Sequence, residues 1–358
     1  MIEYVFSYTS YMTLWFGYYM GGWWNSLSIL YFYILIPIID EITKRKITKT
    51  VTDKTINTIT NKDKTLVKKY EKYIIDKFGE EQCYKIILDI WSILYLVNII
   101  IVTLFISSVS TIELLLIIIA NGLVSSVSLI ISHELLHKKS IKNKILSLSI
   151  LLYNSYPHFY WQHKNHHINV ATPLDPATAP LFENIYYFVP KSILLGYLQC
   201  IKQRPWIILL TILSLCFNIF SLYYDINVGL FFSLQSITAI CLLETVNYFE
   251  HYGLSRNYSS ISSQNISFSY EPVKPRHSWD SYYLWSNLLM FNLGKHADHH
   301  VYPYKYYYLL STSSSSPILP FPYPLMILLS LFPSFFRSYI HPLISIPSNI
   351  PISKLKSH

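Results

Sequence analysis

The sequence predicts an all-α integral membrane protein with six transmembrane helices, arranged as three hairpins, and a histidine-rich cap on one side of the membrane. The 358 residues are 52% hydrophobic and only 13% charged, with a mean hydropathy of +0.31. That charged fraction is half of the roughly 25% typical of soluble domains. From Val5 to Ile39 the chain has no Lys, Arg, Asp, Glu or His. Runs of about 20 apolar residues are long enough to span a bilayer.

The apolar stretches come in pairs. The members of each pair are separated by Gly21-Gly22, by 107–111 or by 223–227, and such short segments fit only a tight turn. We expect all 358 residues to form a single membrane-embedded domain. The expected spans are about 5–20, 23–39, 87–106, 112–132, 205–224 and 226–243.

The positive charges all lie on one side of this predicted topology. None of the 28 Lys and Arg residues falls in a hairpin turn or in residues 1–40, and twelve lie between Lys44 and Lys85 in a polar loop over 41–85. The positive-inside rule places this side, with the amino terminus, in the cytoplasm. We therefore expect the inner membrane in a bacterium or the endoplasmic reticulum in a eukaryote. Topology accounts for the net charge of +8 without a nucleic-acid partner.

Two further apolar stretches, 281–294 and 306–336, are poor candidates for spans. The first is short, and the second contains five prolines. Both fit interfacial or re-entrant helices better.

Nine of the thirteen histidines fall in four tight groups on the predicted cytoplasmic side. Two residues four apart share one face of a helix, so such a pair can chelate one metal. Three pairs have that spacing: His133 and His137, His163 and His167, His296 and His300. His166 and His299 point about 100° away round the helix, toward a neighbouring metal. The fourth group contributes His251.

Nine imidazoles exceed the four to six ligands of one metal, whereas two metals with four or five each use them all. Imidazole suits Fe, Zn, Cu and Ni alike, so ligand type leaves the ion open. His133-Glu-Leu-Leu-His137 is also the H-E-x-x-H pattern of zinc peptidases, with Glu134 as general base. A membrane metalloprotease is therefore an alternative, although it leaves most of the clustered histidines unused. A zinc or copper transporter would instead place such residues inside the spans.

Four motifs resemble the membrane-bound alkane monooxygenases, a branch of the integral-membrane desaturase and hydroxylase superfamily. They are Ser132-His-Glu-Leu-Leu-His-Lys-Lys139, His166-His-Ile-Asn-Val-Ala-Thr-Pro-Leu-Asp-Pro-Ala-Thr178, Asn247-Tyr-Phe-Glu-His-Tyr-Gly-Leu254 and Lys295-His-Ala-Asp-His-His300. The third separates this branch from ordinary acyl desaturases. Weaker similarity covers most of the chain.

The resemblance implies a six-helix membrane fold, two non-haem irons and O2-dependent hydroxylation of a hydrocarbon chain, usually at its end. The second cluster departs from the usual Glu-His-x-x-Gly-His-His pattern, because Gln162 replaces Glu and the cluster is one residue shorter. The polar insertion before the fifth span is reduced to little more than 201–206. The ligands carried over from the family are His133, His137, His163, His166, His167, His251, His296, His299 and His300.

Carboxylates beside these motifs complete the predicted site. Glu134, Glu250, Asp175 and Asp298 are expected to orient ligand imidazoles through the ring N–H that faces away from the metal. Glu250 is the best candidate to approach an iron.

The predicted reaction needs two partners. A hydrocarbon or acyl substrate partitions into membrane lipid at about 0.8 kcal/mol per CH2. The chain has no paired CxxC and no G-x-G-x-x-G, so we expect a separate electron donor of rubredoxin, ferredoxin or cytochrome b5 type, with its reductase. A lipid desaturase with the same histidines is the main alternative.

Overall fold

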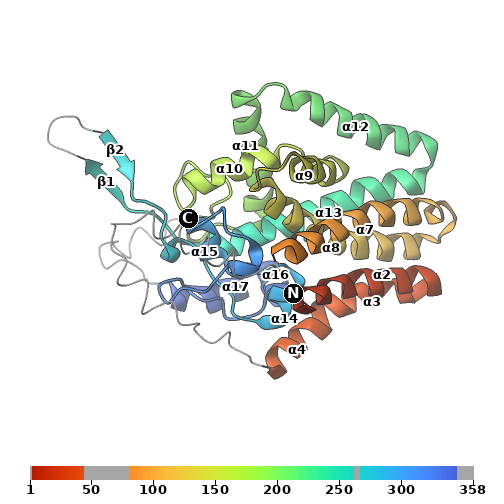
Figure 1. The fold of residues 1–358 in the computed structure, drawn as a ribbon, viewed down its shortest axis with the longest axis horizontal. Helices are drawn as coiled ribbons and strands as arrows, with labels where there is room; N and C mark the ends of the chain where they lie inside the picture. Colours follow the sequence, from red (N-terminus) through yellow and green to blue (C-terminus); the bar gives the residue numbers. More distant parts are fainter. Residues whose placement is uncertain (1, 44–80, 262–266, 345–358) are drawn as a thin grey trace.

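The computed structural model describes residues 2–43, 81–261 and 267–344, and this part of the chain is mostly helical (Figure 1). Long helices lie side by side, and the segments that carry the histidine groups gather at one end of the bundle. The α-helices are α1 (Ile2–Val5), α2 (Thr9–Met20), α3 (Leu27–Leu30), α4 (Ile36–Thr43), α7 (Glu81–Thr103), α8 (Thr111–Leu136), α9 (Ile141–Tyr153), α10 (Phe159–Asn169), α11 (Ile185–Gln203), α12 (Ile207–Tyr224), α13 (Ile226–His251), α14 (Leu284–Leu289), α15 (His296–Val301), α16 (Tyr323–Ser330) and α17 (Pro333–Ile340). The 3-10 helices are η1 (Phe6–Tyr8), η2 (Gly22–Ser26), η4 (Ile106–Ser108), η5 (Pro275–His277), η6 (Tyr307–Leu309) and η7 (His341–Leu343), and η3 (Tyr31–Leu35) is a π-helix.

Five helical segments are long and apolar enough to cross a membrane, which makes this an integral membrane protein by length and composition. They match five of the six predicted spans. Their bounds are Gly22–Thr43, Tyr84–Ser108, Thr111–Leu136, Ile207–Tyr224 and Ile226–His251.

The remaining predicted span, 5–20, is helical through α1, η1 and α2 but is not among the five. Hydroxyl side chains lower its hydropathy. Several bond back to the helix itself, as Ser7 Oγ does to the Tyr4 carbonyl at 2.7 Å and Thr13 Oγ1 to the Ser10 carbonyl at 2.9 Å. The total of six spans stays a prediction.

The all-α expectation is wrong in one region. Strands β1 (Tyr258–Ile261) and β2 (Ser267–Tyr270) form an antiparallel hairpin that projects from the histidine-bearing end of the bundle (Figure 1). Helices α9 and α11 were also not predicted, because lysines and Pro190 interrupt their apolar pattern. The protein is therefore mostly helical, with a small two-stranded sheet.

The predicted polar loop over 41–85 lies largely outside the described residues, and its two ends belong to α4 and α7. The stretches 281–294 and 306–336 contain the short helices α14 and α16. Their interfacial position stays a prediction, as does the single-domain organisation.

Helices α8 and α13 bring two histidine motifs to the same level. Each has 26 residues, and each begins at a capped turn: the Ser110 hydroxyl accepts from Glu113 N–H, and the Asp225 carboxylate accepts from Val228 N–H at 3.0 Å. Both helices leave the turn end of the bundle and run about 39 Å at 1.5 Å per residue. Because they start together and are equally long, their carboxyl ends meet.

Close packing and polar contacts hold these two helices together. A Cβ added to Gly122 of α8 would lie 2.4 Å from Thr238 Cγ2 of α13. Ser125 Oγ donates to Gln235 Oε1 at 2.7 Å across the same interface. Small residues and interhelical hydrogen bonds are the usual means of association between helices in a bilayer, where lipid removes the hydrophobic driving force.

We expect Gly122→Val to push α8 and α13 apart and to destabilise the fold by about 1–3 kcal/mol, the usual cost of overpacking. Thermal unfolding of the detergent-solubilised protein measures the effect. Leu115→Val on the exposed side of α8 is the matched control and should leave the midpoint almost unchanged. An unchanged midpoint for the Gly122 variant would contradict the packing argument.

Candidate metal centre

Four segments from distant parts of the chain supply the clustered histidines. His133 lies in the last turn of α8, and His137 is the C-cap residue of that helix; α13 ends at His251. Helices α10 and α15 supply the other six, which are His163, His166, His167, His296, His299 and His300.

The nine imidazoles divide into two groups. Within each group, the ligand atoms all lie within 4.8 Å of one another. Each pair with a spacing of four stays in one group. His166 is turned about 100° round α10 from His167 and lies in the other group. His299 is turned in the same way on α15 and lies apart from His300. This partition is the one that the spacing predicts. The five-histidine group contains His133, His137, His163, His167 and His299, and the four-histidine group contains His166, His251, His296 and His300.

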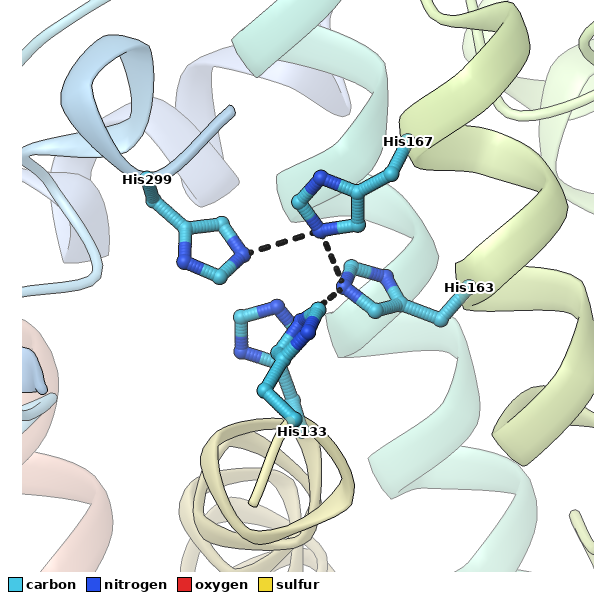
Figure 2. Close-up of side chains that lie close together, drawn as sticks. His133, His163, His167 and His299 are labelled. Carbon is cyan, nitrogen blue, oxygen red and sulfur yellow. Dashed lines mark hydrogen bonds between the residues drawn. The ribbon is translucent and has the colours of Figure 1, made fainter. Parts of the chain in front are cut away.

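In the five-histidine group the Nε2 atoms face one another. Figure 2 shows His133, His163, His167 and His299 pointing into one space from three different segments. His163 Nε2 lies 2.7 Å from His167 Nε2 and 3.0 Å from His137 Nε2. His299 Nε2 lies 3.1 Å from His167 Nε2.

The four-histidine group is similarly compact. His296 Nε2 lies 3.1 Å from His251 Nε2 and 2.9 Å from His300 Nε2, and His300 Nε2 lies 3.2 Å from His166 Nε2. All four side chains are buried. The five-histidine group differs in that His137 and His167 are only half-buried.

Burial favours the neutral form of His137 and of five further histidines in the two groups. Burial, helped by the Lys138 and Lys164 charges, lowers the pKa of His137 to about 3. Burial, followed by the neighbouring histidines, also lowers the pKa values of the group members His163, His167, His296, His299 and His300. Neutral imidazole is the form that binds a metal.

The donor set fits bound metal ions. A neutral imidazole has one N–H, so facing Nε2 atoms cannot all be satisfied by one another. His133 Nε2 is buried without a hydrogen-bond partner, although His133 belongs to the five-histidine group. A buried polar atom without a partner costs free energy, and a metal ion at the centre of each group removes that cost. The residues therefore form two adjacent sites able to bind metal.

Comparison with known proteins identifies the family. The sequence profile of the fatty acid desaturase family matches residues 110–327, which include all four histidine motifs. The chain belongs to the fatty acid desaturase family. It is 29% identical to alkane 1-monooxygenase of Pseudomonas putida over 79% of this chain and 74% of that protein. It is 28% identical to alkane 1-monooxygenase 1 of Alcanivorax borkumensis over 88% and 77%, and 31% identical to alkane 1-monooxygenase of Ectopseudomonas oleovorans over 62% and 58%.

The shortened second motif of this desaturase-family member still forms a compact cluster. His163 lies in the five-histidine group with His167, one helical turn away on α10. Gln162, which replaces the usual Glu, is buried and packs against Gly196 of α11. The loss of one residue therefore does not remove His163 from the centre.

Two of the four predicted carboxylates lie against histidines. Asp175 Oδ2 is 2.7 Å from His166 Nδ1, and it also accepts from Thr178 Oγ1 at 2.6 Å. Burial alone would raise the pKa of Asp175, but His166 and Thr178 lower it below its ordinary value. Glu250 Oε2 lies 3.2 Å from His296 Nε2, and Glu250 Oε1 accepts from Tyr323 OH at 2.7 Å.

The other two carboxylates have different partners from those expected. Glu134 forms an ion pair with Lys138, and Asp298 forms one with Lys305. The two carboxylates that were expected to orient imidazoles thus face lysines instead: Lys138 lies four residues after Glu134, and Lys305 lies in the segment that follows α15. Sequence reasoning missed Lys305 and Tyr323, whose separation from the motifs gives no local signal.

We expect the two groups to lose metal independently. His137→Ala and His251→Ala should each remove about one of the two metals, because each deletes a ligand from a different group. Elemental analysis of the purified protein measures metal per chain. His341→Ala, a histidine outside both groups, should retain both metals; equal loss in all three variants would contradict the partition.

We expect Asp175→Asn to weaken metal binding at the four-histidine group by about 10–100-fold, the usual effect of removing a hydrogen-bond partner from a ligand. Competition with a chelator measures the affinity. Asp89→Asn is the matched control, because it removes a carboxylate paired with Lys142 at the surface. If both variants bind metal alike, Asp175 does not act through His166.

Proposed function

We propose that this protein is an O2-dependent, non-haem di-iron monooxygenase that hydroxylates a hydrocarbon chain at its terminal carbon. The observation that carries the proposal is the pair of adjacent histidine groups in a chain similar to alkane 1-monooxygenases over most of its length. The substrate is an alkane or the alkyl part of an acyl chain. The reaction consumes O2, two electrons and two protons, and it yields an alcohol and water.

Two iron ions would be held by the nine histidines, five to one and four to the other. Bound iron supplies the reduction of O2 and the transfer of one oxygen atom into a C–H bond. Imidazoles are neutral, so nearby carboxylates balance part of the metal charge. Glu250 would do so at the four-histidine group, where its Oε2 lies 3.2 Å from His296 Nε2, and Asp175 would fix the ring of His166.

The hydrocarbon would reach the site from the bilayer. A cavity of about 10 Å³ adjoins the five-histidine group; its lining is Ile130, His133, Glu134, Phe291, Leu293, His299 and Leu310. Four of the seven lining residues are apolar and match a hydrocarbon, and transfer from water into apolar surroundings gains about 0.8 kcal/mol per CH2. A volume that holds about one water molecule requires the walls to move when a chain enters.

Electrons would come from a separate rubredoxin, ferredoxin or cytochrome b5 type protein and its reductase. Of the nine clustered histidines, His137 and His167 are the two that are only half-buried. The exposed Lys139 and Lys164 lie close to them in the sequence. Complementary charge steers redox partners together. We propose that this face, with the loop over 41–85, is cytoplasmic and receives the donor.

Two alternatives make different predictions from the same histidines. A lipid desaturase would need only a different placement of the chain at the centre. A zinc metalloprotease would need Glu134 free as a base, whereas Glu134 pairs with Lys138 and accepts from Tyr307 N–H at 3.2 Å. That arrangement favours the oxygenase.

The test is anaerobic purification with metal analysis, followed by turnover under ¹⁸O2 with a generic reductase and donor. We expect about two irons per chain and a terminal alcohol that carries one labelled oxygen. Olefin from acyl substrates would favour the desaturase instead. One zinc without iron, with peptide cleavage abolished by Glu134→Gln, would overturn the proposal.

A further inference from the structure

One loop borders the cavity beside the five-histidine group. Residues 302–311, called here the tyrosine strap, follow α15 directly and contain five tyrosines. Leu310 of the strap lines the cavity together with His133 and His299. Tyr307 packs edge-on against Phe291, another lining residue, with ring centroids 5.3 Å apart. The strap is therefore a wall of the space next to this histidine group.

Glu134 holds the first part of the strap. Its Oε1 accepts from Lys138 Nζ at 2.7 Å and from the Tyr307 backbone N–H at 3.2 Å. Lys138 Nζ also donates to the Lys305 carbonyl at 3.1 Å and lies 4.0 Å from the centre of the Tyr306 ring. Both charged side chains are almost fully buried, at 5% and 7% exposed.

Asp298 holds the second part in the same way. Both of its oxygens accept from Lys305 Nζ at 2.9 Å, and Oδ2 also accepts from Ser311 N–H at 2.9 Å and Ser311 Oγ at 3.2 Å. Each carboxylate thus binds one lysine side chain, and each also accepts a hydrogen bond from one backbone N–H of the strap. The two lysines are linked through the Lys305 carbonyl, so the contacts form one network.

The positions of the two carboxylates in the sequence match as well. Glu134 directly follows His133, and Asp298 directly precedes His299. These are the two histidines that line the cavity. Movement of the strap would therefore be coupled to the two imidazoles at the place where the hydrocarbon is expected to react.

We propose that Glu134 and Asp298 are positioning residues that clamp the tyrosine strap over the cavity and so exclude water from it. This role rests on the proposed monooxygenase function. Two carboxylates and two lysines balance in charge, and the removal of one partner leaves the other buried without a counter-ion. Opening of the strap would admit water to the centre. O2 would then take two electrons from the donor and two protons from water and leave as hydrogen peroxide, while the C–H bond stays intact.

The variants Lys138→Met and Lys305→Met each break one side of the clamp without altering a histidine or its neighbouring carboxylate. We expect both to retain metal and to lower the ratio of alcohol to peroxide by about 10-fold, the lower end of the range for supporting contacts around a metal site. In the double variant the effect should be smaller than the product of the single effects, because both lysines act through one network.

The matched control is the ion pair between Lys191 and Glu183, which is also partly buried, at 17% and 10% exposed, and lies outside the clamp. Lys191→Met should leave the ratio unchanged. An unchanged ratio in the clamp variants, or an equal fall in Lys191→Met, would overturn the proposal. Loss of iron in proportion to activity would overturn it too, because the lysines would then support the ligands instead of excluding water.

Hydrogen–deuterium exchange tests the clamp without turnover. Peptides that cover 302–311 should exchange faster in the Lys138 and Lys305 variants than in the wild type or in Lys191→Met, because the Tyr307 and Ser311 amides lose their buried environment. Unchanged exchange refutes the clamp. If wild-type protein contains no iron and oxidises no hydrocarbon, the proposed function fails, whereas the exchange result still decides whether the two carboxylates hold the strap.

Discussion

The convergence of nine imidazoles at one end of an apolar bundle is the constraint on which the rest of the structure depends. Imidazole nitrogens are costly to bury unless each has a partner. Parallel helices α8 and α13, equal in length and packed at Gly122, bring His133 and His251 to one level. Helices α10 and α15 then complete both groups. Asp175 contacts one of these imidazoles and Glu250 another, so the surrounding polar residues are arranged around the same centre.

The sequence predicted most of what local geometry determines. Helical periodicity is fixed, so the spacing of four and the 100° offset of His166 and His299 were enough to assign them to opposite groups. Five spans were predicted from the length of their apolar stretches, because a helix rises by a fixed distance per residue. The contact between Glu134 and the backbone of Tyr307 was not predictable, because the two residues lie 173 residues apart and no local pattern indicates that contact. Helix α11 was missed since Pro190 and lysines break its apolar run.

The two histidine groups differ in their surroundings, and the difference suits different tasks. The four-histidine group is fully buried and therefore shielded from solvent. The Glu250 carboxylate, 3.2 Å from His296, would balance part of the charge of a bound metal there. The five-histidine group has two half-buried members, His137 and His167, while two other members, His133 and His299, border a cavity whose lining is mostly apolar. In the proposed function, electrons and substrate would therefore reach the same group through different histidines.

That arrangement explains why the clamp lies where it does. A group with half-buried members that also borders a cavity for a hydrocarbon needs a barrier that keeps water out of the cavity. The strap contributes Leu310 to the cavity, while Lys305 of the same strap faces Asp298. Charged pairs give little net stability when buried, but each is costly to break once formed. The network is therefore better suited to hold one closed position of the strap than to stabilise the fold.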